Sequence, residues 1–370
     1  MVKGPSAFSD PRAVEGLLGR IRREADRTDG PISLMEVCGT HTHAIAEAGF
    51  RGRLKPHVRL VSGPGCPVCV TPVDYLDKAE SLAHRPGTLV CTFGDLYRVP
   101  SSLGSLEKAS ADGASVRIVY SPRDAVGIAR DNPSLTVIFL AVGFETTAPT
   151  IAAALEEAER EGVSNFLILP GHKVVPPPLR LLSGDPEVGV QGFLLPGHVS
   201  VITGWRAFDF LPKEYGIPAT VVGFTPVDIL RGILDLLTQR AEGRAEVINL
   251  YGRVVTENGN VSAQRLLDRF FTPEDEVWRG LGTIPGSGLA LRPEWRHRDA
   301  GALVGDLPEP REPVGCLCGA VLKGTVEPPQ CPLFGRACTP DEPVGACMVS
   351  SEGTCAAWYR HERFRLGVGN

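Results

Sequence analysis

The sequence predicts an α/β protein with two similar parallel-sheet domains and a loop-rich C-terminal domain. Short apolar runs alternate with helical patterns over residues 30–243, and polar or sulfur-containing side chains follow many of these runs. Beyond residue 283, glycine and proline become frequent and long periodic segments disappear. We therefore expect a first α/β domain over residues 30–130, a second over 131–243, and a third formed by residues 1–29 and 244–370.

Composition excludes several classes of function. The chain has 370 residues, 43% of them apolar, and a formal net charge of −5 without a long run of one sign. Nothing therefore indicates a nucleic-acid-binding face or a polybasic membrane surface. The first residues lack the apolar core of a signal peptide and no 18-residue apolar stretch occurs, so we expect a cytoplasmic protein without a membrane segment. In that compartment ten cysteines point to ligands or redox groups rather than structural disulfides.

The first unit follows an amphipathic helix expected over residues 11–27. In this unit each apolar run enters a loop and then a helical pattern, which is typical of a parallel sheet with right-handed crossovers. The runs expected as strands are residues 32–37, 58–61, 88–92 and 115–120.

The second unit repeats this arrangement. Its expected strands are residues 135–142, 165–169, 189–195 and 219–222. The tetrapeptide T-P-V-D occurs at 71–74 and again at 225–228, each time after a strand and before a helix. The repetition is consistent with two related halves, although T-P-x-D is also a general capping sequence. From residue 244 we expect extended or irregular chain, with a helix over 263–271.

Paired cysteines occupy the loop S-G-P-G-C-P-V-C-V-T-P-V-D at residues 62–74. Its prolines stiffen the loop, and a helix beginning near Asp74 would direct its positive end toward Cys66 and Cys69, favouring thiolates. This predicts a redox dithiol. Two alternatives remain, namely half of a structural zinc site and two small buried hydrophobic residues.

A second sulfur-bearing motif is C-G-T-H-T-H at residues 38–43. Cys38, His41 and His43 offer a soft thiolate and two imidazoles, which can ligate iron or zinc. Alternatively, Cys38 is a buried cysteine after a strand and the histidines help to cap the next helix. Cys91 lies within an apolar strand and is interpreted as ordinary core.

Polar groups also follow later strands. Ligands of open α/β sheets bind at the carboxyl ends of strands, so these residues predict a functional cleft between the two domains. Glu145 could act as an acid, a base or a partner of an iron ligand, or could favour the next helix N-terminus through its charge. His172 of P-G-H-K and His198 of P-G-H-V-S could bind a carboxylate or orient their loops.

The C-terminal cysteines give the clearest metal signal. Cys316, Cys331, Cys338 and Cys355 are separated by 14, 6 and 16 residues. Paired C-x-x-C knuckles are missing there, so a zinc ribbon fits poorly, whereas four thiolates from a loop-rich segment suit an iron–sulfur cluster. Cys318 could replace Cys316 as a ligand, and Cys347 could replace Cys355. The remaining alternative is a set of scattered structural cysteines.

Five separated motifs occur together in one order. They are C-G-T-H-T-H at 38–43, G-P-G-C-P-V-C-V-T-P at 63–72, G-F-E-T-T at 143–147, P-G-H-V-S at 196–200, and the tail C-x14-C-x6-C-x16-C with C-P-L-F-G and M-V-S-S-E-G-T-C. This combination, from about residue 32 to the C-terminus, resembles the HypD family of [NiFe]-hydrogenase maturation proteins.

The resemblance implies two α/β domains facing a cleft and a third domain carrying a [4Fe-4S] cluster. It implies a scaffold, formed with the small protein HypC, for an iron atom that receives carbon monoxide and cyanide, the latter from a thiocyanate on HypE. The iron would then pass to the hydrogenase large subunit. Cys38 would ligate the iron at the HypC interface with His41 beside it, and Cys66 and Cys69 would form a thiol–disulfide pair. The implied cluster ligands are Cys316, Cys331, Cys338 and Cys355.

These roles suggest that electrons flow from the cluster, through Cys66 and Cys69, to chemistry at an iron held by Cys38. Two other classes of function remain. One is a stand-alone, cluster-dependent thiol–disulfide reductase, similar in logic to ferredoxin–thioredoxin reductase. The other is a non-catalytic metal-binding platform whose C-x-x-C holds structural zinc.

Overall fold

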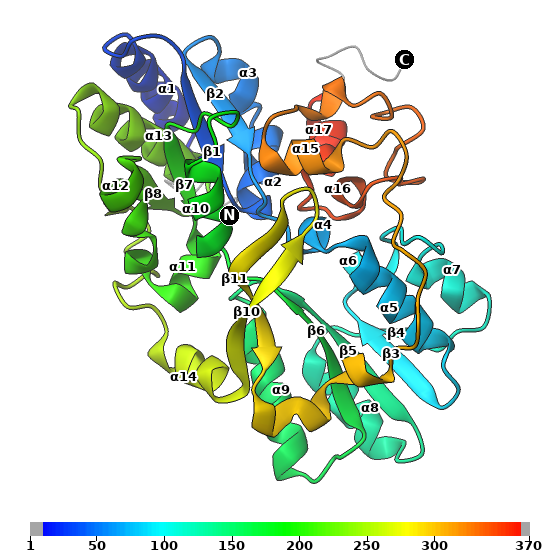
Figure 1. The fold of residues 1–370 in the computed structure, drawn as a ribbon. Coiled ribbons are helices and arrows are strands. Elements are labelled where there is room, and N and C mark those ends of the chain that lie inside the picture. Colours follow the sequence, from blue (N-terminus) through cyan, green and yellow to red (C-terminus); the bar gives the residue numbers. More distant parts are fainter. Residues whose placement is uncertain (1–9, 364–370) are drawn as a thin grey trace, which may run out of the picture.

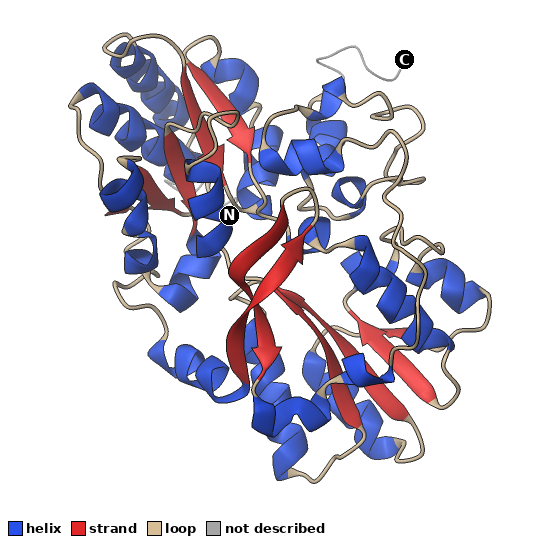
Figure 2. Ribbon diagram, in the orientation of Figure 1, coloured by secondary structure: helices blue, strands red, loops and turns tan. Residues whose placement is uncertain are grey.

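Two parallel sheets form the framework of the computed structural model, which describes residues 10–363 (Figures 1 and 2). The first sheet has the order β2-β1-β7-β8-β9 and the second the order β4-β3-β5-β6. The first contains β1 (Ile32–Glu36), β2 (Val58–Ser62), β7 (Gly192–Pro196), β8 (Ala219–Val222) and β9 (Val247–Asn249). The second contains β3 (Thr88–Thr92), β4 (Val116–Ile118), β5 (Thr136–Gly143) and β6 (Phe166–His172). The α/β class with parallel sheets is confirmed.

The chain crosses between the sheets twice. It leaves the first sheet after β2 and returns to it after β6. Residues 30–130 therefore supply two strands to each sheet, and residues 131–243 supply β5 and β6 to one and β7 and β8 to the other. Each sheet therefore contains strands from both sides of the boundary expected at residue 130. The sequence does not reveal this exchange of strands, because every crossover has the same local strand–loop–helix pattern.

Helices cover both sheets. The N-terminal helix α1 (Pro11–Ala25) confirms the amphipathic helix expected over residues 11–27, and its buried residues pack with those of α13 (Pro226–Ala241). The remaining helices of the first unit are α2 (Gly39–Glu47), α3 (Phe50–Leu54), α4 (Pro67–Val70), α5 (Val73–His84), α6 (Gly94–Tyr97), α7 (Leu106–Ala111) and α8 (Pro122–Asp131). Those that follow are α9 (Ala148–Arg160), α10 (Pro176–Ser183), α11 (Gly197–Thr203), α12 (Phe210–Tyr215) and α14 (Val261–Phe270), with a 3₁₀ turn at Trp205–Phe208.

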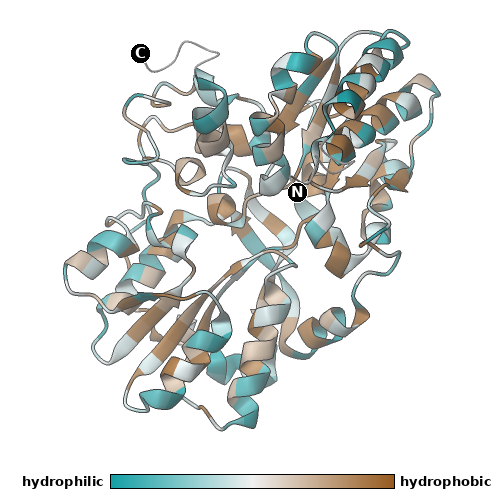
Figure 3. Ribbon diagram, turned by 180° about the vertical axis from the view of Figure 1, so that it is seen from behind, coloured by the Kyte–Doolittle hydropathy of each residue, from teal (hydrophilic) through white to brown (hydrophobic). Residues whose placement is uncertain are grey.

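The sequence explains the local structure. The run T-V-I-F-L-A-V-G of β5 is buried over almost its whole length because the strand lies between β3 and β6 with helices nearby. Figure 3 shows the same contrast, with hydrophobic colour concentrated in the strands and hydrophilic colour on outer helix turns. Of the two T-P-V-D copies, only the second caps a helix through its threonine, since Thr225 Oγ1 accepts from Asp228 N at 3.2 Å. Thr71 instead donates back to Pro67 O at 2.9 Å.

An antiparallel hairpin that the sequence analysis did not predict lies between the two sheets (Figure 1). It consists of β10 (Phe271–Trp278) and β11 (Gly282–Leu291). Its backbone bonds to both neighbouring regions, from Val174 N to Ser287 O and from Arg279 N to Val70 O, each at 2.9 Å. The acidic run of β10 and the glycines of β11 hide the alternation by which a hairpin is recognised.

The C-terminal segment consists of short helices joined by loops. Its elements are α15 (Cys318–Lys323), α16 (Ala346–Val349), α17 (Thr354–His361) and 3₁₀ turns at Pro293–Arg298, Ala300–Leu303 and Pro328–Gln330. Helix α17 packs on α2, and α16 packs on α4. The outer ends of the expected third domain, residues 1–9 and 364–370, lie outside the described residues. Among residues 10–363, no helix is both long enough and apolar enough to cross a membrane.

Candidate functional site

The loops that carry Cys38 and Cys66 are in direct backbone contact. Strands β1 and β2 are parallel neighbours, so their carboxyl ends deliver both loops to the same edge of the sheet. Gly39 N donates to Gly65 O at 2.9 Å. A Cβ on Gly65 would lie 2.2 Å from Cys38 N, so only glycine permits this approach. The structure thus brings the two predicted sulfur motifs together.

Cys66 and Cys69 form a disulfide with Cα atoms 5.2 Å apart. Both residues are buried, and Cys66 Sγ accepts from Cys69 N at 3.2 Å as the cap of α4. The helix beginning near Asp74 is present as α5, but the helix that starts at the sulfurs is the shorter α4. In this state the two sulfur atoms are bonded to each other rather than available to zinc.

Cys38 caps α2 and its thiol is buried. Burial raises the pKa of this thiol to about 12, and the nearby carboxylates of Glu352 and Glu36 raise it further. The backbone amides of His41 and Thr40 act in the opposite direction, as expected at a helix N-terminus. The free thiol is therefore protonated at neutral pH, and a bound metal ion would have to displace its proton.

His41 and His198 converge on one aromatic ring. Their ring centroids lie 4.7 and 4.0 Å from that of Phe224. His41 is buried, its Nε2 lies 3.0 Å from Gly223 O, and its Nδ1 has no hydrogen-bond partner. Burial lowers the pKa of His41 to about 4, so the ring is neutral and can act as an acceptor or ligand. His198 is exposed beside it. His43 instead packs edge-on against His361 with centroids 4.8 Å apart.

Glu145 and His172 lie at the edge of the second sheet. Glu145 Oε1 accepts from Val175 N at 2.9 Å, so the carboxyl group holds the start of α10 rather than that of α9. Burial raises its pKa to about 7. His172 is fully buried with both ring nitrogens unpartnered, and burial lowers its pKa to about 3. A partner's carboxylate cannot reach His172 there. Cys91 lies in the apolar core of the second sheet, as predicted.

All six C-terminal cysteines line one cavity that is otherwise mostly apolar. The lining contains Cys316, Cys318, Cys331, Cys338, Cys347, Cys355, Leu317, Val321, Phe334, Gly345 and Met348. Cys318 Sγ lies 2.8 Å from Cys347 Sγ, and these two sulfurs also contact Cys316 and Cys355, respectively. The contact with Cys318 and burial raise the pKa of Cys316, whereas the contact with Cys347 lowers the pKa of Cys355 and burial there raises it above its usual range. The geometry favours neither Cys316 nor Cys318 as a ligand.

The donor set of this cavity fits an iron–sulfur cluster. Within the described residues, no group of three or more His, Cys, Asp or Glu side chains is arranged to hold a single metal ion. A [4Fe-4S] cluster is larger than an ion and takes four thiolates around its periphery, so thiols distributed around one cavity suit it better. The lining contains sulfur and hydrocarbon groups but no carboxylate.

The segment between Cys347 and Cys355 connects this cavity to Cys38. Glu352 Oε1 accepts from Thr40 Oγ1 at 3.0 Å, and Ser350 Oγ donates to Asp95 Oδ2 at 2.8 Å. Gly39 faces Glu352 so closely that a Cβ would lie 2.3 Å from Glu352 Cβ. Glu352 belongs to the motif M-V-S-S-E-G-T-C, but its role leaves no signal in the sequence, because its partner Thr40 is 312 residues away.

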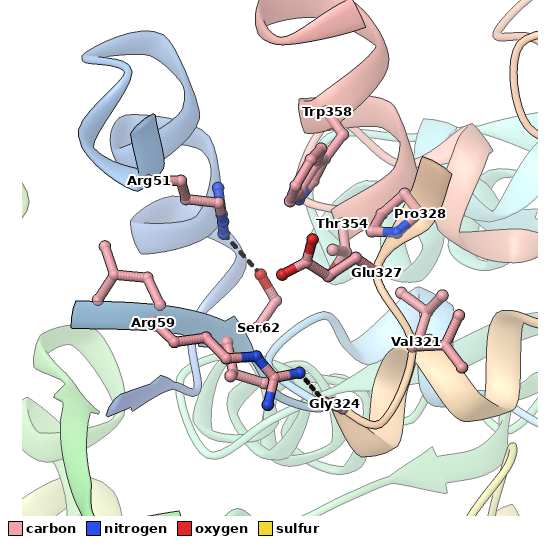
Figure 4. A pocket seen from close by; sticks show the side chains of 12 residues that line it. Arg51, Arg59, Ser62, Val321, Gly324, Glu327, Pro328, Thr354 and Trp358 are labelled. Atoms are coloured by element: carbon pink, nitrogen blue, oxygen red, sulfur yellow. Dashed lines mark hydrogen bonds between the residues drawn. The ribbon is translucent and has the colours of Figure 1, made fainter. Parts of the chain in front are cut away.

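Arg51 is a second residue that sequence reasoning missed (Figure 4). Its buried guanidinium donates to Ser62 Oγ at 2.8 Å and to Glu362 Oε1 at 3.1 Å, and it lies 5.3 Å from the Trp358 ring centroid. Ser62 is the first residue of the C-x-x-C loop, whereas Trp358 and Glu362 follow Cys355 in the chain. A single arginine in a loop-rich stretch carries no sequence signal for such a role.

Comparison with known proteins gives a consistent result. The sequence profile described as "HypD: Hydrogenase formation hypA family" matches residues 12–362. The chain is 44% identical to the hydrogenase maturation factor HypD of Rhodobacter capsulatus, over 97% of this chain and 98% of that protein. It is 44% identical to the HypD of Azotobacter vinelandii, over 98% and 97%, and 43% identical to that of Escherichia coli K12, over 96% and 97%. The similarity extends over nearly the whole of each chain.

Proposed function

This chain belongs to the HypD family of hydrogenase maturation factors, and we propose that it acts with HypC as the scaffold on which the Fe(CN)2CO group of [NiFe]-hydrogenase is assembled. In this proposal the iron is cargo, held by Cys38 at the interface with HypC. HypE supplies cyanide as a thiocyanate, and the finished group passes through HypC to the hydrogenase large subunit. All of these steps take place in the cytoplasm.

The observation that carries the proposal is the contact between the Cys38 and Cys66 loops, with Gly39 N bonded to Gly65 O. It brings a candidate iron ligand next to a pair of cysteines that can exchange electrons. His41 stands three residues from Cys38 with an unpartnered Nδ1, and His198 shares the Phe224 ring with it. A soft thiol, a neutral imidazole and a shielded surrounding suit iron that must bind cyanide and carbon monoxide.

The cysteine pair has a defined redox task in this proposal. Cleaving a thiocyanate, RS–CN, to a thiol and cyanide consumes two electrons and one proton. Oxidising the thiols of Cys66 and Cys69 to the disulfide releases two electrons and two protons. One proton goes to RSH and the other to solvent, and the cyanide anion remains as the ligand for the iron, so the step balances. Regenerating the two thiols then takes two electrons and two protons, and the electrons must come from a donor other than the cysteine pair.

The six-cysteine cavity supports the proposed source of electrons for this cysteine pair. A [4Fe-4S] cluster bound there by Cys316, Cys331, Cys338 and Cys355 would supply electrons one at a time. Helix α16 contains Cys347, one of the cysteines that line the cavity, and packs on α4, which begins after Cys66 and contains Cys69. The packing gives a short route between the two sulfur sites. The sulfurs of Cys318 and Cys347 contact each other, and they lie between the sulfurs of Cys316 and Cys355 in this series of contacts.

The test is anaerobic Mössbauer and infrared spectroscopy of the protein co-purified with HypC. We expect the signals of a four-iron cluster together with a separate low-spin iron and its cyanide and carbonyl bands. A cluster without additional iron or bands would contradict the scaffold and favour a cluster-dependent thiol–disulfide reductase. Reduction of a disulfide substrate without HypC would then be expected. Stoichiometric zinc and no redox-active disulfide would indicate a non-catalytic platform.

A further inference from the structure

A buried arginine, Arg279, lies where α4, the helix that contains Cys69, comes close to the six-cysteine cavity. Arg279 is at the tip of the β10–β11 hairpin and is 3% exposed. Its backbone N donates to Val70 O at 2.9 Å, and Val70 directly follows Cys69. The next residue, Gly280, touches Gly319, because a Cβ on Gly280 would lie 2.1 Å from Gly319 Cα. Gly319 directly follows Cys318. The hairpin tip therefore joins the two sulfur sites.

The charge of Arg279 is poorly compensated by the protein. Its Nε lies 3.5 Å from Glu312 Oε1, but Nε and Nη2 make no hydrogen bond. Glu312 is 59% exposed, so its interaction is weakened by solvent. A buried guanidinium with unused donors is costly unless an anion faces it. Its positive charge acts on the thiols of Cys316 and Cys318, where it opposes the rise in their pKa.

We propose that Arg279 is the counter-charge of an anionic metal–thiolate centre in the six-cysteine cavity. This inference rests on the proposed function, in which that cavity holds a cluster. Four thiolates around a cluster or a divalent ion leave a net negative charge, and one more negative charge arrives with each electron. A fixed cation in a water-poor environment stabilises the more negative state. Arg279 is thus a positioning and charge-tuning residue that raises the reduction potential of the centre.

Two readouts test this assignment. The first is the affinity of the anaerobically reduced, cluster-free protein for Co²⁺, followed by thiolate-to-cobalt charge-transfer absorption. The second is the potential of the cluster reconstituted with iron and sulfide, followed by electron paramagnetic resonance. For Arg279→Gln we expect Co²⁺ binding about tenfold weaker and a one-electron reduction equilibrium about tenfold less favourable, a shift of about 59 mV. Arg279→Lys, which keeps the charge, should restore most of both.

Two control variants sharpen the test. Arg336→Gln removes the same charge from an exposed residue two positions before Cys338, and should change neither readout more than about twofold. Glu312→Gln removes the carboxylate that partly offsets Arg279, and should shift both readouts in the opposite direction, by less. Because Glu312 is exposed, this variant should fold normally.

Each outcome decides between the assignments. Equal behaviour of Arg279→Gln and Arg336→Gln would overturn the counter-charge while leaving the cluster proposal intact. Loss of Co²⁺ and cluster binding in both Arg279→Gln and Arg279→Lys would assign Arg279 to packing and also overturn it. If the unmodified protein bound neither Co²⁺ nor a cluster, the proposed function and this inference would fail together.

Discussion

Arg51 Nη2 lies 3.5 Å from Glu36 Oε1, and both side chains are almost completely buried. Glu36 ends β1, two residues before Cys38, and its Oε1 also accepts from Thr42 Oγ1 at 2.6 Å. The same guanidinium contacts Ser62 and Glu362. Arg51 therefore links the end of the strand that precedes Cys38, the start of the C-x-x-C loop and the C-terminal end of α17, the helix that contains Cys355.

Arg51→Met should destabilise the protein strongly. The substitution leaves the buried carboxyl groups of Glu36 and Glu362 without their cation, and breaking a buried pair in this way costs about 3–5 kcal/mol. Urea unfolding gives the free energy of unfolding of the variant. Arg53→Met is the control, because Arg53 pairs with Glu15 at the surface and its loss should cost at most about 1 kcal/mol. Equal losses for the two variants would contradict the role of Arg51.

Gly39→Ala should weaken the contact between Cys38 and the C-terminal segment. The new Cβ would lie 2.3 Å from Glu352 Cβ and 2.8 Å from Glu352 O, so one of the two segments must move. Such overpacking costs about 1–3 kcal/mol. Gly52→Ala is the matched control, because no atom lies within 4 Å of a Cβ there and alanine favours a helix by about 0.5–1 kcal/mol. We expect the thermal unfolding temperature to fall for Gly39→Ala and to rise slightly for Gly52→Ala.

The fold class could be predicted because each strand and helix carries its own local pattern. Strand β5 reads as a buried strand, and α1 shows its apolar stripe. Which sheet a strand joins is not a local property, so the crossing after β2 left no signal. The hairpin of β10 and β11 was missed because its stability comes from docking between the sheets rather than from alternation.

The candidate site divides in the same way. Cys38, Cys66 and Cys69 stand out because sulfur at strand ends is unusual and the spacing is short. Arg51, Arg279 and Glu352 could not be found, since each acts through partners that are distant in sequence, up to 312 residues away for Glu352. Glu145 shows a mixed case. Its position at a strand end was readable, but its bond to Val175 across a second loop was not.

Glu145→Gln should change how stability depends on pH. Burial raises the pKa of Glu145 from 4.5 to about 7, so between these values the folded state binds a proton that the unfolded state has lost. Stability therefore falls as pH rises through this window. Glutamine does not titrate. Between pH 5 and pH 8 the free energy of unfolding should therefore fall less for the variant than for the unmodified protein, by on the order of 2 kcal/mol. Urea unfolding at both pH values measures this.

Glu294→Gln is the control for that experiment, because Glu294 is exposed. It should leave the pH dependence unchanged. A Glu145→Gln variant whose unfolding free energy follows the same pH profile as the unmodified protein would show that the buried carboxyl group is ionised in the folded state.

Serine at the predicted cluster ligands should abolish cluster binding. Cys331 and Cys338 line the cavity and have no neighbouring cysteine offered as a replacement in sequence. We expect Cys331→Ser to reduce bound iron and sulfide after anaerobic reconstitution to background. Cys91→Ser controls for cysteine loss, since Cys91 lies in the apolar core of the second sheet and should leave the iron content unchanged. A fully loaded Cys331→Ser protein would exclude Cys331 as a ligand.

Cys316→Ser and Cys318→Ser separate the two candidates for the first ligand position. Both side chains line the cavity and contact each other. The variant that loses the cluster identifies the ligand. Loss of the cluster in both variants would indicate that cluster binding needs the whole series of sulfur contacts, from Cys316 through Cys318 and Cys347 to Cys355. We expect Cys316→Ser to lose it, in keeping with the spacing on which the ligand set was predicted.

Cys66→Ala should abolish hydrogenase maturation without removing the cluster. The alanine fits the buried position, and the loss of the sulfur that caps α4 should cost about 0.5–2 kcal/mol, which leaves the fold intact. Cys69 alone cannot form an intramolecular disulfide with Cys66 and therefore cannot supply the two electrons. Hydrogenase activity in cells that carry the variant, together with the visible absorption of its purified cluster, separates the two effects. Unchanged cluster absorption with no active hydrogenase is the expected result. Loss of the absorption would place Cys66 in the binding of the cluster, and normal maturation would remove the dithiol from the reaction.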